Sequence, residues 1–402
     1  MKQPELLAPA GNLEKLNVAL HYGADAVYFG LSELSLRAKS GNFSQEQLQK
    51  AIELTHAAGK KAYVTINIFP HNRDIGLITE HIRFLAASAP DAVIISDPGV
   101  FELISKHAPQ VQIHISTQAN ITNYNSAEFW QRLGASRLVL SRELSIEEIS
   151  EIREHVAIEL ECFVHGSICI SYSGRCYMSS FLANRSANSG LCTNSCRWRY
   201  ALMEEKRPGE YFPVYEDDSG AYMLSSKDLC MLPYLDKLCK AGINCFKIEG
   251  RIKGINYLAA VTGVYREAID TLSADSYKVK ERWMQTLAMS SNRGFTTGMF
   301  LGPQPQSDYN HNETEIYKAT HTLVGVIKAL NSNGTGMVSL RNNLKVGDTL
   351  ICQTINHQNP EFEITHIKDT DGNEIISAHN EQSVVIPLPP AAAVSDIIRR
   401  SV

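Results

Sequence analysis

The sequence predicts a (β/α)8 barrel that carries a cysteine-rich insertion after its seventh strand and is followed by a small C-terminal β-barrel domain. Short apolar runs alternate with amphipathic stretches, the pattern of a parallel sheet with crossover helices. The seventh connection is nearly eighty residues long, and short β-prone runs follow a Pro-rich segment at residues 302–306. A doubly wound open sheet is the rival fold. It usually has fewer strands, and its phosphate-binding fingerprint is missing after the first strand.

Eight short apolar runs are expected to form the barrel strands. They are residues 5–8, 26–29, 62–68, 92–96, 112–118, 137–141, 158–165 and 244–249. The stretches between them have apolar residues at helical spacing, and Asn12, Ser44 and Ser145 are suitable N-caps for three of those helices. A longer helical stretch, residues 254–289, follows the eighth run.

The chain is expected to divide into a barrel, a linker and a small domain. The barrel spans residues 1–301 with the insertion at 167–243, the linker spans 302–320, and the small domain spans 321–402. Its expected strands are residues 324–327, 336–340, 349–353, 361–367 and 383–387. Small barrels of this kind often contact RNA, but this one lacks an aromatic stacking motif, so a structural role is equally compatible with the pattern.

Composition excludes several classes of protein. The 402 residues are 44% hydrophobic and 20% charged, which suits a globular chain with a sizeable core. No apolar run approaches the roughly 18 residues of a membrane span, and residues 1–11 lack a signal pattern. We therefore expect a cytoplasmic protein with no membrane partner. The formal net charge of −5 excludes a globally basic nucleic-acid binder but permits a local basic patch.

Polar side chains follow the predicted strands where a barrel carries its chemistry, at the C-terminal ends. Any one of them could be a turn former or a helix cap, but so many ionisable groups rarely converge on a barrel mouth. The expected rim consists of Asn67, Gln118, Arg142, Glu143, His165, Lys247, Glu249 and Arg251.

Five of the nine cysteines fall in the insertion. They are Cys169, Cys176, Cys192, Cys196 and, after an expected hairpin over residues 211–224, Cys230. Residues 161–200 contain four arginines and one acidic residue, a local charge of 4 − 1 = +3. Thiolates beside cations have lowered pKa values, which favours metal ligation. The other four cysteines lie in strand or helix patterns and are expected to be buried thiols.

The spacing of the clustered cysteines favours an iron-sulfur cluster over zinc. Only Cys192 and Cys196 loosely fit a zinc knuckle, whereas four thiolates of uneven spacing can reach the corners of one cubane. The C-x₃-C-x₂-C run of a radical-SAM enzyme is absent, because Arg199 stands where its third cysteine would be.

Motifs in and around the insertion resemble those of the collagenase-like peptidase family U32. They include ECFVHGSIC at 161–169, YSGRCYMS at 172–179, CTNSCRW at 192–198, SKDL at 226–229 and KIEGR at 247–251. The similarity extends from PELLAPAG at residues 4–11 to the small domain, so it covers nearly the whole chain. Within the family, the chain most resembles the members that hydroxylate tRNA.

The resemblance implies oxygen-independent conversion of a wobble uridine in tRNA to 5-hydroxyuridine, with prephenate metabolism involved and a prephenate-derived oxygen donor as one candidate. It also implies a 4Fe-4S cluster on four cysteines. Cys169, Cys176 and Cys192 are the common ligand candidates, and the fourth is either Cys196 or Cys230. We prefer Cys196 because it is near in sequence. An electron donor or a paralogous protein is a candidate second partner beside tRNA.

The rim and the insertion suggest roles for individual residues. Arg142, Lys247 and Arg251 would hold carboxylate or phosphate oxygens, and Glu249 or His165 would move protons. A target base would be flipped into the barrel. Substrate binding is further assigned to Asn67, Gln118, Arg175, Arg185, Arg197 and Arg199.

Three other activities are kept as alternatives. The family name suggests a peptidase, but the sequence lacks the zinc-protease, serine-elbow and aspartic-dyad motifs. A cysteine nucleophile working with His165 is conceivable. The remaining alternatives are a non-catalytic iron-sulfur carrier and a hydroxylase of another substrate, such as a ribosomal RNA cytidine or a ubiquinone precursor.

Overall fold

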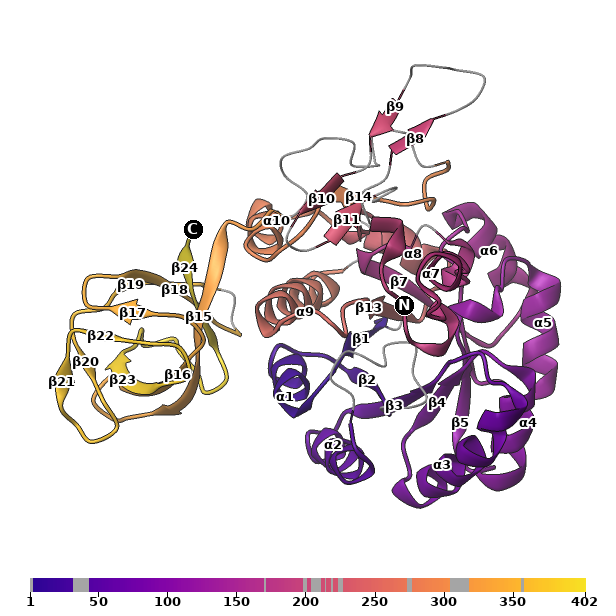
Figure 1. Cartoon of the computed structure of the whole chain (residues 1–402), viewed down its shortest axis with the longest axis horizontal. Coiled ribbons are helices and arrows are strands. Elements are labelled where there is room, and N and C mark those ends of the chain that lie inside the picture. The colour runs from indigo at the N-terminus through magenta and orange to yellow at the C-terminus, as the bar shows by residue number, and fades with distance from the viewer. Residues whose placement is uncertain are drawn as a thin grey trace.

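The computed structural model consists of a closed parallel barrel ringed by helices and a C-terminal antiparallel sheet domain (Figure 1). This arrangement confirms the predicted fold class. The structure describes residues 3–31, 43–169, 171–197, 201–203, 211–213, 215–217, 220–222, 227–272, 277–303, 318–355 and 358–402. In these parts of the chain, no helix is long and apolar enough to cross a membrane.

Eight parallel strands form the barrel, and each lies at one of the predicted apolar runs. They are β1 (Glu5–Pro9), β2 (Ala26–Gly30), β3 (Lys61–Ile66), β4 (Ala92–Ile95), β5 (Gln112–Ile115), β6 (Arg137–Val139), β7 (Glu159–Ser167) and β13 (Cys245–Ile248). Strand β13 pairs in parallel with both β7 and β1, which closes the barrel.

Helices on the outside of the barrel connect the strands. They are α1 (Leu13–His21), α2 (Gln45–Ala57), α3 (Ile75–Ser88), α4 (Pro98–His107), α5 (Tyr124–Leu133), α6 (Ile146–His155), α8 (Leu235–Lys240) and α9 (Ile255–Asp270). Asn12, Ser44 and Ser145 cap α1, α2 and α6 as expected. The long helical stretch expected at 254–289 is instead two helices, α9 and α10 (Glu281–Ala288), and residues 273–276 between them lie outside the described chain.

An ion-pair network fills the N-terminal half of the barrel interior. Arg137 pairs with Glu5 at 2.7 Å, with Glu159 at 2.6 Å and with Glu161 at 3.3 Å. The Lys247 Nζ lies 2.7 Å from the other oxygen of Glu161. Because these side chains project inward from neighbouring strands, the network forms a packed floor beneath the open C-terminal end.

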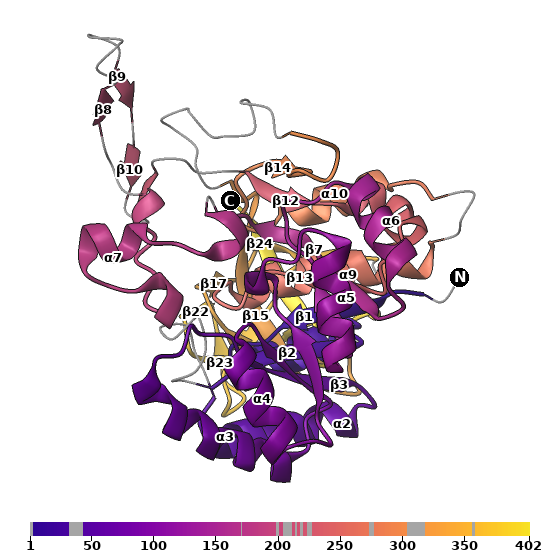
Figure 2. The same cartoon turned by 90° about the vertical axis from the view of Figure 1, so that its right-hand side faces the viewer.

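The insertion after β7 lies at the end of the barrel opposite the N-terminus (Figure 2). It contains the short helix α7 (Met178–Ala183), the antiparallel pair β8 (Ala201–Met203) and β9 (Tyr211–Pro213), and the pair β10 (Tyr215–Asp217) and β11 (Gly220–Tyr222). The β10–β11 pair is the hairpin expected from the sequence. Strand β12 (Asp228–Cys230) then pairs antiparallel with β7 and parallel with β14 (Phe295–Thr296).

The C-terminal domain is an antiparallel sheet in the order β19-β18-β24-β15-β16-β23-β20-β21. Its strands are β15 (His321–Leu330), β16 (Thr335–Leu340), β18 (Thr349–Gln353), β19 (Glu361–Glu363), β20 (Ile367–Lys368), β21 (Glu374–Ile375), β23 (Ser383–Pro387) and β24 (Ile397–Ser401), with a separate pair of β17 (Leu344–Lys345) and β22 (Ser377–Ala378). The single strand expected at 361–367 is split into β19 and β20. Most of the expected linker, residues 304–317, lies outside the described chain.

Candidate functional site

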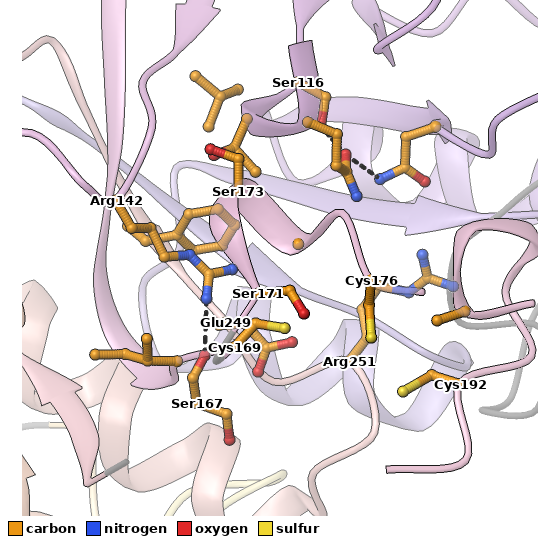
Figure 3. Close-up of a pocket in the computed structure, with 18 of the residues that line it drawn as sticks. Ser116, Arg142, Ser167, Cys169, Ser171, Ser173, Cys176, Cys192, Glu249 and Arg251 are labelled. Carbon is orange, nitrogen blue, oxygen red and sulfur yellow. Dashed lines mark hydrogen bonds between the residues drawn. The ribbon is translucent and has the colours of Figure 1, made fainter. Parts of the chain in front are cut away.

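A cavity of about 170 Å³ lies at the C-terminal mouth of the barrel, between the strand ends and the insertion (Figure 3). Its barrel side includes Asn67, Gln118, Arg142, Lys247, Glu249 and Arg251, so these six sequence-predicted residues lie on one cavity. They come from four different strands or the turns that follow them, because the ends of parallel barrel strands meet at one face.

One wall of the cavity consists of linked amide and hydroxyl groups. The Asn67 amide donates to Gln118 Oε1 at 3.4 Å, and Ser116 Oγ donates to the same oxygen at 2.5 Å. Ser116 and Gln118 are buried, so their orientations are fixed by each other. Such a wall suits recognition of a polar planar group, because it presents donors and acceptors in fixed directions.

Two arginines face this wall from other strands. The Arg142 Nη1 donates to the Ser167 carbonyl at 3.0 Å, and its guanidinium stacks 4.3 Å from the centre of the Phe163 ring. No carboxylate of the described residues is ion-paired with Arg142. Arg251 is 4% exposed and donates to Thr65 Oγ1 at 3.2 Å. Guanidinium groups held this way suit bidentate binding of phosphate or carboxylate oxygens.

Lys247 and Glu249 complete the charged lining, and both are nearly buried. The Lys247 ammonium is committed to Glu161 and lies 4.6 Å from the Tyr28 ring centre, so it belongs to the floor of the cavity. Glu249 is the one carboxylate among the described lining residues. Its backbone is fixed by the His165 carbonyl, at 2.9 Å, and by the Tyr257 hydroxyl, at 2.7 Å.

Arg293 also lines the cavity, although the sequence analysis did not single it out. Its guanidinium makes two hydrogen bonds to Asp228 Oδ1, at 3.1 and 2.6 Å, and both side chains are buried. Arg293 lowers the pKa of the Asp228 carboxyl, outweighing the effect of burial. The pair ties β12 to the turn before β14. The polar pair Asn292-Arg293 before a glycine was the available sequence signal.

Four of the five candidate ligand cysteines line the cavity from the insertion side: Cys169, Cys176, Cys192 and Cys196. Figure 3 shows the sulfur atoms of Cys169, Cys176 and Cys192 facing a shared space beside Arg251. Cys192 Sγ accepts the backbone N–H of Asn194 at 3.4 Å. Backbone N–H groups of this kind stabilise thiolate ligands.

Cys230 does not belong to this group. It is 3% exposed on β12, and Tyr265 donates to its sulfur at 3.8 Å. Burial raises the pKa of its thiol to about 11. The structure therefore places Cys230 apart from the other four cysteines, since β12 pairs with β7 and Cys230 lies in the core. Its role as a cluster ligand stays a prediction from the sequence.

The number and type of these side chains match the ligands of a four-thiolate cluster, because four free thiols from one segment line a single cavity. In the described residues, however, no three His, Cys, Asp or Glu side chains are gathered closely enough to hold a metal ion. The thiols lie in segments of short 3₁₀ turns and one six-residue helix rather than in long regular elements.

His165 does not line the cavity, which corrects its predicted place at the barrel mouth. A β-bulge shifts the β7–β13 register, so that Lys247 pairs with Phe163 but Ile248 pairs with His165. The bulge turns the imidazole outward, where its ring packs against Tyr257, Tyr265 and Phe295. Burial lowers the pKa of His165 to about 4.

Of the four arginines assigned to substrate binding, Arg175 and Arg185 are described as part of the insertion and are not among the residues that line the cavity. Arg175 is exposed, and its Nε donates to the Gln118 carbonyl at 2.9 Å. Arg185 follows α7 and is half-buried. The Arg197 side chain and the whole of Arg199 lie outside the described residues. Glu143 accepts hydrogen bonds from the backbone N–H and hydroxyl of Ser173, so it anchors the insertion.

Comparison with known proteins identifies the family. The sequence model of peptidase family U32 matches residues 11–310, and that of the family's C-terminal domain matches residues 319–399. The chain belongs to peptidase family U32. Among solved structures, the U32 peptidase Mk0906 has a TM-score of 0.41 and 15% identity, and the match covers 61% of this chain and 93% of that one.

Curated relatives of this U32 protein carry two kinds of name. The tRNA hydroxylation protein P of Escherichia coli is 37% identical over 97% of this chain and 94% of its own. The tRNA hydroxylation protein P1 of Bacillus subtilis is 38% identical over 96% of this chain and 91% of its own. A protein of Porphyromonas gingivalis named collagenase is 35% identical over 76% of this chain and 75% of its own.

Proposed function

We propose that this U32 protein is a tRNA-modifying enzyme that hydroxylates C5 of a wobble uridine without molecular oxygen. The observation that carries the proposal is the meeting of four thiols, two positioned arginines and one carboxylate on a single cavity at the barrel mouth. The near full-length similarity to tRNA hydroxylation proteins gives the substrate class.

The cationic lining is suited to anionic parts of the substrates. Among the described lining residues, Glu249 is the one carboxylate, and the cations are Arg142, Lys247, Arg251 and Arg293. Lys247 and Arg293 are neutralised by Glu161 and Asp228. The Arg142 guanidinium, which has no ion-paired carboxylate among the described residues, would bind a nucleotide phosphate or the carboxylate of an oxygen donor such as a prephenate derivative. The positive charge of Arg251 on the same cavity would attract that anion. The Asn67–Gln118 wall would hold the edge of the flipped uracil ring.

Hydroxylation replaces the C5–H bond by C5–OH, which takes two electrons from the uracil ring and releases the C5 proton. The oxygen donor gives up its OH group, and the rest of the donor leaves with the two electrons and a proton. Glu249 is placed to accept the C5 proton, because it is the carboxylate of the described lining and its backbone is fixed on both sides. A 4Fe-4S cluster, when bound, would supply the redox centre. Cys169, Cys176, Cys192 and Cys196 would hold it, and an electron donor or a paralogous protein would return it to its starting oxidation state between turnovers.

The cluster proposal is tested with cysteine variants of the anaerobically purified full-length protein. We expect Cys169→Ser and Cys176→Ser to lose iron and acid-labile sulfide, because each removes one of four ligands. Cys230→Ser is the matched control and should keep the iron content of the parent protein. Unchanged iron in the first two variants, or loss of iron in the control alone, would contradict the ligand set.

The activity is tested by deleting the gene and measuring modified nucleosides in tRNA by mass spectrometry. We expect 5-hydroxyuridine to disappear and to return when the intact gene, but not a Cys176→Ser gene, is supplied. Cleavage of gelatin by the purified protein, together with unchanged tRNA nucleosides in the deletion strain, would favour a peptidase. That alternative has less structural support, because no histidine of the described residues lines the cavity.

A further inference from the structure

Three aromatic side chains in the described part of the insertion are exposed, whereas three of its serines are buried. Tyr172, Tyr177 and Phe181 are 54%, 75% and 78% exposed. In contrast, Ser173, Ser179 and Ser195 are at most 4% exposed. Soluble proteins seldom expose several large aromatic side chains in one short segment unless that surface contacts another molecule.

Polar contacts hold the insertion in place without those aromatic side chains. Ser179 Oγ lies 3.2 Å from Ser195 Oγ and accepts the Thr193 N–H at 3.2 Å. Glu143 binds the backbone N–H and the hydroxyl of Ser173, at 2.6 and 2.9 Å. Since these bonds fix the fold of the segment, the three exposed aromatic side chains are available for binding.

The charge of the segment indicates what it binds. Residues 162–203 contain four arginines and no lysine, aspartate or glutamate, in a chain whose net charge is −5. Arg175 is exposed between Tyr172 and Tyr177 in the sequence. Its Nε is bonded to the carbonyl of Gln118, a residue that lines the cavity. Exposed aromatic side chains and excess positive charge, in a segment whose Arg175 is bonded to a residue of the cavity lining, suit unpaired nucleotides of an RNA loop.

We propose that Tyr172, Tyr177 and Phe181 form a platform on which unpaired bases of the RNA substrate stack, while Arg175 and Arg185 bind the adjacent phosphates. The proposal rests on the proposed function and specifies how that substrate is held. When one base enters the cavity, its neighbours in the loop lose their stacking partners, and the platform replaces them. Because every base has a π-face, the platform needs no particular sequence.

The test measures binding of a fluorescent RNA stem-loop with a seven-nucleotide unpaired loop to the anaerobically purified full-length protein at several salt concentrations. We expect the double variant Tyr177→Ala/Phe181→Ala to bind at least about fivefold more weakly at every salt concentration, with the slope of log Kd against log salt unchanged. Arg185→Gln should instead flatten that slope. Tyr177→Trp/Phe181→Trp should restore affinity, because tryptophan also stacks.

Phe129→Ala is the matched control, since Phe129 is 46% exposed on α5 and outside the insertion; its affinity should match the parent protein. Parent-like affinity of the double alanine variant would overturn the platform while leaving the proposed function intact. Absence of RNA binding by the parent protein would overturn both. Light scattering tests whether the surface instead binds a second copy of the chain. The proposal is wrong if the parent protein self-associates while the double alanine variant stays monomeric and keeps the RNA affinity of the parent protein.

Discussion

At the scale of single residues, we expect a substitution of Arg142 to affect the reaction rate much more than the stability of the fold. It makes one hydrogen bond to a backbone carbonyl and stacks on Phe163, and no described carboxylate depends on it for charge balance. We expect Arg142→Ala to lower the rate of uridine hydroxylation by about 10²-fold or more, because an anionic group in the cavity loses its positioned partner. The free energy of unfolding should fall by about 1 kcal/mol or less.

Arg142→Lys tests whether geometry matters beyond charge. Lysine keeps the charge but cannot bind two oxygens in a fork, so most of the loss should remain. Reconstituted hydroxylation assays give the rates, and iron content and urea unfolding are measured on the same samples. Loss of iron or of folding in either variant would show that Arg142 is structural. Full activity would place the chemistry elsewhere.

The second prediction at the scale of single residues concerns Glu5 and how the stability of the fold depends on pH. Burial would raise its pKa, but hydrogen bonds and charge from Arg137, with a smaller effect of Lys61, lower it to about 2 from 4.5. A carboxyl whose pKa is lower in the folded state stabilises the fold above pH 4.5 and loses that effect as pH falls toward 2.

Glu5→Gln should therefore be less stable than the parent protein at pH 7, by about 3 kcal/mol, because Arg137 keeps only two of its three carboxylate partners. The difference between the two proteins should shrink below pH 4.5. Urea unfolding at pH values between 7 and 3.5 measures it. A difference that stays constant over this range would show that ionised Glu5 is not the source of the stabilisation.

Which site residues could be predicted depends on how regular the strand ends are. Arg142, Glu249 and Arg251 follow strands directly, so the barrel rule predicts the face on which they lie. His165 could not be placed this way, because the bulge opposite Lys247 breaks the two-residue alternation of β7. Arg293 was missed because it reaches the cavity from outside the eight barrel strands, through a short strand that pairs with β12.

At the scale of elements, the close approach of β7 to the turn after β13 depends on Gly166. Its φ is +110°, and an added Cβ would lie 2.6 Å from the Glu249 carbonyl oxygen and 2.9 Å from the Tyr257 hydroxyl. Gly166→Ala should therefore displace the Glu249 backbone, abolish hydroxylation and destabilise the fold by about 1–3 kcal/mol.

Gly76→Ala is the control for that substitution. Gly76 lies in α3 with no atom near its would-be Cβ, so alanine should leave activity unchanged and stabilise the helix by about 0.5–1 kcal/mol. Thermal unfolding and hydroxylation rates are compared for both variants. A fully active Gly166→Ala protein would show that the position of Glu249 tolerates this displacement.

Helices and strands could be predicted from the sequence where their apolar residues repeat at the spacing of that element. Buried parallel strands read as continuous apolar runs, and the N-caps of α1, α2 and α6 mark where their helices begin. The antiparallel domain was harder: β17, β21 and β22 have two residues each and leave no periodic signal, and β24 ends in Arg399-Arg400-Ser401. Residues 171–196 of the insertion follow no period, and hydrogen bonds of Ser173, Ser179 and Ser195 help to hold them.

At the scale of the whole molecule, the small domain is docked on the barrel through buried polar contacts. Gln353 Nε2 donates to the Ala259 carbonyl of α9 at 2.7 Å, and His21 Nε2 lies 2.8 Å from the buried Asp396. Arg399, fully buried, donates to the Asn256 carbonyl at 3.0 Å. Contacts on both faces of α9 explain why thirteen of its sixteen residues are buried. The two domains should therefore unfold together.

Tyr22 is the centre of this interface and gives the test of that coupling. Its hydroxyl donates to the Gln353 carbonyl at 2.7 Å and accepts the Ile397 N–H at 3.1 Å, and all three groups are buried. Tyr22→Phe leaves a donor and an acceptor without this partner, so the free energy of unfolding should fall by about 1–3 kcal/mol. Tyr124→Phe is the control, because the Tyr124 hydroxyl has no hydrogen bond to a described residue.

The coupling of the two domains is measured by hydrogen exchange of backbone amides at increasing urea concentration. We expect the amides of α1 and β24 to lose their protection against exchange at the same urea concentration. If β24 lost protection while α1 kept the parent level, the domains would be independent, and the interface would contribute little to the stability of the barrel that carries the site.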